Sequence, residues 1–337
     1  MKNGLVDQRR RALGMLLVAN ACWGLSFPLM KALGLLQAGV AGESGSWFTT
    51  AMMVGPRFAL AALVLAAALG RSLNDLRRSE WQQGIGLGIF AALGMLFQAD
   101  GIQFTHASTS AFLTQFYAVL IPVYLALRSR TNPGARVWLC VLLVMVGSGV
   151  LGGFDWRDLR LGRGEAETLL ASVFFMGQIL LLERAEFAGN RASRITFVMF
   201  AVEAVVFLGL GVATVPSMQA VLAPLAQPAW WLFTLGLTLF CTLGAYGLMN
   251  HWQPRITATE AGLIYCVEPI FGSVFALFLP AWFSRLGNLS YANEQVTVAL
   301  LVGGGLITVA NVLLQSRPPV TPLPPAPITP AAAPHPG

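Results

Sequence analysis

Long apolar stretches recur along almost the whole chain, and they restrict its fold more than any other feature of the sequence. Each is close to the roughly 20 residues that an α-helix needs to cross a hydrocarbon core of about 30 Å. Backbone groups find no water inside a bilayer, so a helix must satisfy them within the segment. We therefore predict about ten membrane spans. They are residues 11–36, 47–69, 81–104, 108–127, 134–151, 166–186, 194–215, 229–251, 259–280 and 295–315.

The composition agrees with a chain whose solvent is lipid. Of the 337 residues, 56% are hydrophobic and only 11% are charged, whereas soluble domains carry about 25% charged residues. The four cysteines lie in apolar segments without the spacing of a redox or metal motif. We predict that they are packing residues, with no metal site and no cofactor. They are Cys22, Cys140, Cys241 and Cys266.

Motifs of soluble enzymes are missing from the sequence. It contains no G-x-S-x-G, H-E-x-x-H or G-x-x-x-x-G-K-[ST] pattern, which would mark a serine nucleophile, a zinc site or a phosphate loop. Gly84, Gly86 and Gly88 fall inside a predicted span with no strand before them. We interpret them as a site of close helix packing. A membrane-embedded enzyme is therefore only a distant alternative.

The formal net charge of +6 comes from basic residues that lie mostly between the spans. With the N-terminus in the cytoplasm, about 15 Lys and Arg residues fall in inner connections and about four in outer ones. This asymmetry follows the positive-inside rule. It predicts an inner-membrane protein with both termini in the cytoplasm. The charge is explained without a nucleic-acid partner, and none is predicted.

The chain contains a weak internal duplication, a common property of secondary transporters. Aligning Thr105 with Thr257, an offset of about 152, matches Phe104–Ser108 with Ile256–Glu260. Each stretch precedes the fourth span of a set of five, and because five is odd the second set must be inverted. The predicted domains are a cytoplasmic N-terminus at 1–10, a first repeat at 11–151, a periplasmic connector at 152–165, a second repeat at 166–316 and a disordered Pro-rich cytoplasmic tail at 317–337.

Five ionisable side chains lie inside the predicted spans, where each costs about 2.5–3.5 kcal/mol unless it is paired or faces water. We predict that they serve in coupling or gating. Lys31 and Asp100 lie toward span ends, where snorkelling to the interface is the alternative. Glu203 lies near the mirror position of Arg57 in the second repeat, which suggests an ion pair between them. For Glu268, a role in packing alone is the alternative.

Proline residues inside the spans predict points of flexure. Pro269 follows Glu268 near the middle of the ninth span, and a proline there leaves a backbone carbonyl one turn earlier without its helical partner. A carboxylate beside such a break predicts a polar, bendable site. Pro28 and Pro122 are the other two predicted hinges.

Aromatic, amide and hydroxyl side chains recur near the middle of several spans. Such a mixture suits a cavity that holds an amphipathic solute without binding it too tightly. Any one of these residues alone is more typical of an interhelical hydrogen bond. Taken as a set, eight of them are predicted to bind substrate: Trp23, Ser26, Gln98, Thr114, Tyr117, Gln178, Tyr246 and Tyr265.

Four short motifs occur in the order and in the spans of a known family. Trp23–Pro28 with Lys31 fits the pattern W-G-x-x-F-x-x-x-K, and Arg57 with Phe58 fits R-F. Thr105–Thr114 is similar to T-x-A-x-x-A-F-L-T, and Ile264–Pro269 resembles L-E-P. In these motifs the chain resembles the drug/metabolite transporter superfamily, specifically its ten-helix EamA-type branch, over about residues 9–316. The resemblance implies two inverted five-helix repeats and export of metabolites such as amino acids, commonly from the bacterial cytoplasm.

The sequence departs from that family pattern in three places. Asp100 occupies a position that is usually uncharged. The longer segment Pro280–Glu294 replaces the usual G-E after the ninth helix. Phe116 and Tyr117 fall where the second half has Glu268 and Pro269, so coupling through an acidic residue would differ between the halves.

Together these patterns predict an all-α integral membrane protein, with about ten transmembrane helices in two inverted five-helix repeats, that acts as a secondary transporter. The predicted cargo is a small metabolite, amino-acid-like or otherwise amphipathic, exported by alternating access, with proton coupling left open. An importer or an uncoupled facilitator of the same fold is the alternative. The predicted partners are the small-molecule substrate, the lipid bilayer and protons, in a monomer or a homodimer.

Overall fold

The computed structural model describes residues 2–41, 44–104, 110, 113–130, 132–151 and 162–315. The duplicated stretch at 105–108, most of the predicted connector and the predicted tail lie outside these residues. Within them, regular structure is helical and no strand occurs. The elements are α1 (Lys2–Ala41), α2 (Ser46–Leu69), η1 (Gly70–Asp75), α3 (Arg78–Gly101), α5 (Tyr117–Ser129), α6 (Ala135–Leu151), α7 (Arg163–Leu182), η2 (Ala185–Phe187), α8 (Ala192–Thr214), α9 (Met218–Leu225), α10 (Pro228–Gly236), the π-helix η3 (Leu237–Gly244), α11 (Ala245–Trp252), η4 (Gln253–Arg255), α12 (Ala258–Tyr265), α13 (Glu268–Ala276), α14 (Leu279–Gly287) and α15 (Val298–Gln315).

These helices lie at the ten predicted spans and confirm an all-α membrane protein. Six segments are long and apolar enough to cross a bilayer by themselves, namely α1, α2, α3, α7, α8 and the segment Pro228–Arg255. The helices α12 and α13 occupy the ninth predicted span, and α14 follows them at a bend of 61°. The shorter apolar helices α5, α6 and α15 occupy the fourth, fifth and tenth.

The short α-helix α9 lies outside the predicted spans, and α14 lies almost entirely outside them. The hydroxyl of Ser217 caps α9 by accepting a hydrogen bond of 3.2 Å from the backbone N–H of Ala220, which satisfies one of the donors that a helix start leaves open. Pro280 lies in the first turn of α14, where its missing N–H costs nothing. Both helices pack against α1. They follow longer spans in the chain and lie against the bundle.

The glycines of α3 confirm the predicted close packing. A Cβ atom at Gly84 would lie 2.5 Å from Cβ of Val198, and one at Gly88 would lie 2.6 Å from Cβ of Val202. Both valines belong to α8, and no ordinary side chain tolerates such distances. Small residues therefore allow α3 and α8 to touch along their backbones, as is common between membrane helices.

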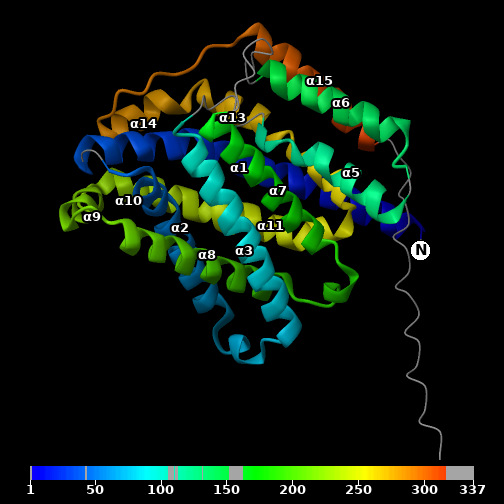
Figure 1. Cartoon of the computed structure of the whole chain (residues 1–337), viewed down its shortest axis with the longest axis horizontal. Coiled ribbons are helices and arrows are strands. Elements are labelled where there is room, and N and C mark those ends of the chain that lie inside the picture. The colour runs from blue at the N-terminus through cyan, green and yellow to red at the C-terminus, as the bar shows by residue number, and fades with distance from the viewer. Residues whose placement is uncertain are drawn as a thin grey trace, which may run out of the picture.

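The first helix runs through the middle of the bundle. It contacts α13, α11, η3 and α9, while α2 packs along α8 and α3 packs against both α7 and α8. The helices α6 and α15 lie side by side at one edge of the molecule (Figure 1). The helices α2 and α8 are the second spans of the two predicted sets, and α6 and α15 are the fifth spans. In the structure α2 packs against α8, and α6 packs against α15. This is the pairing that two related sets would make, and the repeat itself stays a prediction.

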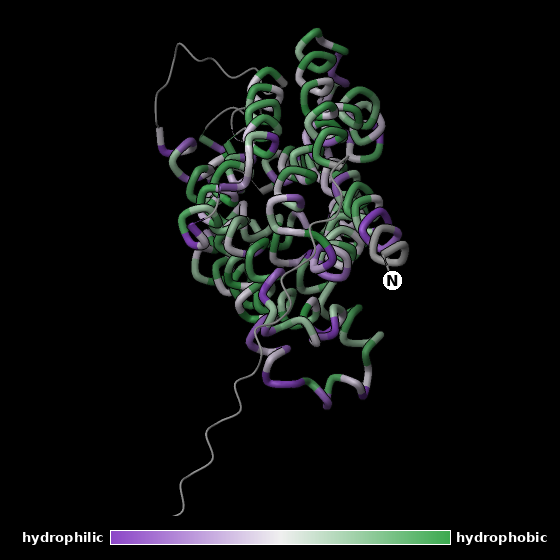
Figure 2. Tube along the Cα trace, turned by 90° about the vertical axis from the view of Figure 1, so that its right-hand side faces the viewer, coloured by the Kyte–Doolittle hydropathy of each residue, from purple (hydrophilic) through white to green (hydrophobic). Residues whose placement is uncertain are grey.

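Hydrophobic residues recur along most helices of the bundle (Figure 2), and many of them are exposed on its outside. Leu63, Val205, Val212 and Leu301 are between 66% and 78% exposed on their helices. A soluble protein rarely leaves so much apolar surface in contact with water. The outer face of the bundle is therefore suited to contact with lipid hydrocarbon.

Candidate functional site

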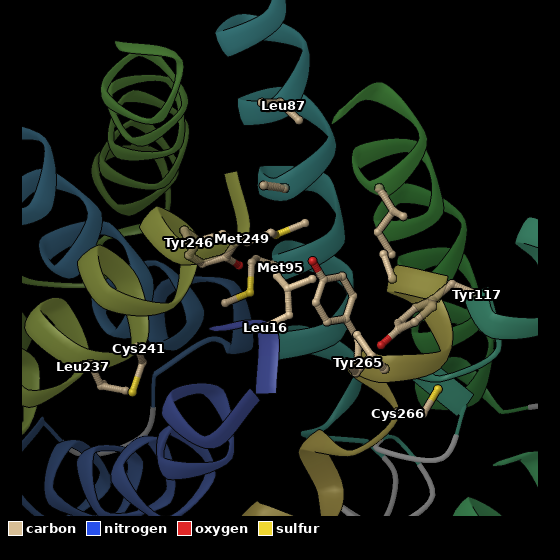
Figure 3. Packing of buried hydrophobic residues seen from close by; sticks show 14 of the residues in the cluster. Leu16, Leu87, Met95, Tyr117, Leu237, Cys241, Tyr246, Met249, Tyr265 and Cys266 are labelled. Carbon is tan, nitrogen blue, oxygen red and sulfur yellow. The ribbon is translucent and has the colours of Figure 1, made fainter. Parts of the chain in front are cut away.

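A central cavity of about 610 Å³ lies among helices from both halves of the chain. Figure 3 shows Tyr117 of α5, Tyr246 of α11 and Tyr265 of α12 gathered in this interior region. All eight residues that the sequence predicted as substrate-binding line the cavity, although their role in binding stays a prediction. They are Trp23, Ser26, Gln98, Thr114, Tyr117, Gln178, Tyr246 and Tyr265.

The central cavity extends to one end of the bundle, which we call the mouth. On α1 its lining begins at Trp23 and continues to Leu35, so the first half of that helix takes no part. The lining residues that are exposed are Lys31, Leu35, Gln103 and Glu294. All four lie at the end where α1 and α3 finish, so a solute in the cavity can reach solvent from that side.

Three aromatic rings form a wall of the central cavity. The Trp23 ring lies edge-on to the rings of Tyr246 and Tyr265, with centroids 5.3 Å and 5.4 Å apart. Edge-to-face pairs of this kind are favourable and fix the ring orientations. The indole Nε1 of Trp23 is buried and has no hydrogen-bond partner within the described part of the chain. It is therefore a donor that a bound solute can satisfy.

Hydroxyl and amide groups of α3 and the fourth span also line the cavity, and hydrogen bonds connect them. Nε2 of Gln98 on α3 donates to Oγ1 of Thr114 at 3.1 Å, and that hydroxyl donates to the carbonyl of Ser110 at 2.9 Å. The hydroxyls of Ser110 and Thr168 are 3.1 Å apart. These hydrogen bonds join α3 to α7 through the fourth span, and they leave polar side chains facing the cavity where sequence analysis expected them.

The Arg57 guanidinium lines the central cavity from α2. Its Nε donates to the hydroxyl of Thr242 at 3.1 Å, and its Nη1 lies 3.8 Å from the sulfur of Met30. Thr242 belongs to the π-helix η3, an irregularity that often marks a functional site. The hydroxyl of Thr238, one π-helical turn earlier, contacts the carbonyl of Arg57 at 3.4 Å. The Arg57 guanidinium therefore places a positive charge in the cavity, and its partners, Thr242 and Met30, are neutral.

The predicted ion pair between Arg57 and Glu203 is not formed. Glu203 on α8 is fully buried, and neither of its carboxylate oxygens has a hydrogen-bond partner among the described residues. It does not line the central cavity. Phe58, which follows Arg57 on α2, instead packs against Phe200 of α8 with centroids 5.7 Å apart. The two charges therefore lie near each other on packed helices without touching.

Glu268 and Pro269 line the central cavity where α13 begins. The ninth span is interrupted between Tyr265 and Glu268, which is the kind of break that the proline predicted. Within the described residues, the Glu268 carboxylate forms no hydrogen bond and no ion pair. At the mouth, the Lys31 ammonium lies over the Tyr291 ring, 5.1 Å from its centroid. The cavity therefore holds groups of both charges.

Asp100 lies outside the lining of the central cavity, at the end of α3. Its Oδ2 accepts a hydrogen bond of 2.5 Å from Nη2 of Arg163, whose Nε donates to Glu167 at 2.8 Å. The Arg163 guanidinium also lies 4.0 Å from the centroid of the Phe104 ring. These contacts tie the buried Asp100 at the end of α3 to the start of α7, and a coupling role for Asp100 stays a prediction.

The three predicted hinges differ in their positions. Pro28 lines the central cavity inside α1, which continues unbroken from Lys2 to Ala41. Pro269 lies in the first turn of α13. Pro122 is buried inside α5 and lines no part of the cavity. Movement at these residues stays a prediction.

Away from the mouth, the cavity ends at hydrogen bonds that the sequence analysis missed. The Tyr265 hydroxyl donates to Oε1 of Gln253 at 2.8 Å, and Nε2 of Gln253 donates to the carbonyl of Ile179 at 2.8 Å. Gln253 lies just before α12 and Ile179 lies on α7. The Gln253 amide therefore links Tyr265 of α12 to Ile179 of α7 and closes the space behind Tyr265.

An ion pair closes the same side further from the mouth. Nη2 of Arg9 on α1 lies 2.5 Å from Oε1 of Glu260 on α12, and both side chains are largely buried. Glu260 also belongs to a capping box with Thr257, a motif that its Thr-x-x-Glu spacing reveals in the sequence. Nearby, Glu183 accepts a hydrogen bond of 3.0 Å from the backbone N–H of Ala258, and burial raises the pKa of Glu183. We call Arg9, Glu260, Gln253 and Tyr265 together the closed end.

Known proteins resemble this chain in sequence and in fold. Residues 10–152 match the EamA-like transporter family. A protein of Archaeoglobus fulgidus described as an uncharacterized transporter is 26% identical over 314 residues, which cover 90% of this chain and 85% of that protein. A solved crystal structure superposes with a TM-score of 0.67 at 16% identity, covering 90% of this chain and 96% of the other. That structural likeness concerns the fold alone.

Proposed function

We propose, from the premise that this chain is a membrane transporter with an EamA-like domain at residues 10–152, that it exports small amphipathic metabolites by alternating access. The one observation that carries the proposal is a solute-sized cavity with a mouth at one end and a closed end at the other. A carrier needs such an arrangement, because a site reached from both sides at once would leak. The rocking of two related halves around a central site is a common transporter design.

The direction of export rests on the distribution of basic residues. Arg9, Arg10 and Arg11 lie at the start of the first span, on the side of the closed end. By the positive-inside rule this side is the cytoplasm, so the mouth faces outward. The structure then corresponds to a carrier at the stage at which cargo leaves, in an inner membrane with cytoplasmic termini.

The charges and rings of the cavity support an amino-acid-like cargo. Arg57 and Lys31 offer positive charge, Glu268 offers negative charge, and the Trp23 ring offers an apolar face. A zwitterion with a hydrophobic part satisfies all of these groups, and a few placed polar groups in a mostly apolar pocket are typical of small-molecule sites. Glu268 has no partner within the described residues and is the group best suited to carry a proton.

The test is a comparison of metabolites in cells of a bacterial host that produce the chain. Mass spectrometry of medium and cell extract should show at least one small metabolite accumulating outside cells with the wild-type protein. The Trp23→Ala variant should lose this accumulation, whereas Trp47→Ala, which alters an exposed tryptophan on α2, should retain it. Size-exclusion chromatography of the purified variants checks that both are folded. Identical metabolite profiles in all cells would rule out the proposal.

Three measurements separate the rival functions: the metabolite comparison in cells, flux in proteoliposomes and product formation in detergent. An importer would concentrate the metabolite inside the cells. An uncoupled facilitator would show flux in proteoliposomes that is independent of a pH gradient. A membrane-embedded enzyme would form a new product in detergent, where no compartments exist.

A further inference from the structure

A second cavity of about 440 Å³ adjoins the central cavity on the mouth side of the bundle. We call it the side vestibule. It lies between the last turns of α1 and the first turns of α2, with α9 against it. Gly34, Thr49 and Gln103 line both spaces. Its lining consists of Gly34, Gln37, Ala38, Ser44, Phe48, Thr49, Met52, Gln103, Ala220 and Pro224.

Gln37 is the unusual residue of the side vestibule. Its side chain is only 5% exposed, and among the described residues neither its Nε2 nor its Oε1 has a hydrogen-bond partner. Leaving a buried polar group unsatisfied costs about 1–3 kcal/mol, and here both ends of one amide are affected. The neighbouring Gln103 shows the contrast, because its Nε2 donates to Thr50 and to the carbonyl of Ala99. A ligand that bonds to Gln37 would remove the cost.

The lining defines the chemistry of that ligand. None of the ten described residues around the side vestibule is ionisable, whereas the central cavity holds Lys31, Arg57 and Glu268. A primary amide offers an acceptor and donors side by side, so its best partner is another neutral group with a donor beside an acceptor. A phospholipid headgroup is disfavoured, because none of the described lining residues is basic and could pair with its phosphate.

We propose that the side vestibule is a second binding site on the path by which cargo leaves, where Gln37 hydrogen-bonds an amide or hydroxyl group of the solute. The proposal rests on the proposed transport function. Cargo that leaves the charged central cavity passes Gly34 and Thr49, which belong to both sites. A neutral site beside the mouth holds a solute through hydrogen bonds alone and releases it easily.

The binding test uses trifluoroacetamide, a neutral primary amide, with the purified protein in detergent. Fluorine NMR of the probe should show line broadening with the wild-type protein. The broadening should fall by at least half in Gln37→Met, which keeps the side-chain length and loses the amide, and also in Gln37→Ala. The control is Asn311→Leu, because Asn311 is a buried amide on α15 that donates to Ile307 and lines neither cavity.

The outcomes of the test distinguish this inference from the proposed function. Equal broadening in the wild-type and both Gln37 variants would overturn the vestibule site, even if export in cells were intact. Gln37-dependent broadening without export by any variant would overturn the transport function and leave the site. Loss of the broadening when bilayer lipid is added to the micelles would show a lipid site and overturn the exit role. If the inference is correct, Gln37→Met also lowers export several-fold with unchanged expression.

Discussion

Among single residues, Glu268 combines a position in the central cavity with a carboxylate that no described residue pairs. An acidic group inside a membrane protein is costly unless water, a proton or a cation reaches it. We expect Glu268→Gln to make flux into proteoliposomes insensitive to a pH gradient, because the amide keeps the shape and cannot carry the proton. Flux of the exported metabolite, measured with and without the gradient, checks this.

The matched control for that prediction is Glu294→Gln. Glu294 also lines the cavity, but it is exposed at the mouth, where solvent reaches it in any state. Its variant should keep the response to the gradient. If Glu268→Gln responds like the wild type, Glu268 is not part of coupling.

Sequence reasoning found the cavity residues because polar side chains in apolar spans are conspicuous. Trp23, Gln98 and Tyr265 stood out against their surroundings, and they line the central cavity. Arg9 and Glu260 did not, since charged residues near span ends are ordinary. Gln37 was missed for a different reason: its isolation depends on how α1, α2 and α9 enclose it, which spacing along one chain cannot show.

Among the elements, the crossing of α1 and α13 depends on two glycines. A Cβ atom at Gly24 would lie 2.5 Å from Cβ of Phe271 and 2.8 Å from the backbone nitrogen of Gly272. We expect Gly24→Ala to destabilise the protein by about 1–3 kcal/mol, the usual cost of overpacking, because backbone atoms cannot move aside. Thermal unfolding in detergent measures the loss.

The control lies on the same helix. A Cβ atom at Gly14 would meet no atom of another element within 4 Å, so Gly14→Ala should leave the unfolding temperature equal or slightly higher, since alanine is the better helix former. Equal unfolding temperatures for Gly24→Ala and Gly14→Ala would show that the crossing tolerates a wider spacing.

The predicted elements agree with the structure where hydrophobicity alone determines them. The spans at α2, α3 and α8 are long apolar runs, and the EamA-type resemblance is confirmed over residues 10–152. The short helices α9 and α14 could not be placed in the same way, because with 8 and 9 residues they carry no 20-residue apolar signal. The π-helix η3 was also beyond reach, since the sequence Leu237–Gly244 reads as ordinary apolar helix.

For the whole molecule, the balance between its two access states should depend on the closed end. The Arg9–Glu260 ion pair joins α1 to α12, and a hydrogen bond to a charged group contributes about 1.5–3 kcal/mol. A change of about 1.4 kcal/mol shifts a two-state equilibrium tenfold. Arg9→Gln or Glu260→Gln should therefore shift the protein roughly tenfold or more toward the state that opens on the other side.

Cysteine labelling measures that shift directly. In a background without Cys22, Cys140, Cys241 and Cys266, a Ser26→Cys reporter in the central cavity should react with an impermeant maleimide added at the mouth. Arg9→Gln should slow this reaction, and the charge exchange Arg9→Glu with Glu260→Arg should restore it, because the pair re-forms with reversed signs. A reaction rate that neither variant changes would mean that the ion pair holds only local structure and that Gln253 and Tyr265 keep the cavity closed without it.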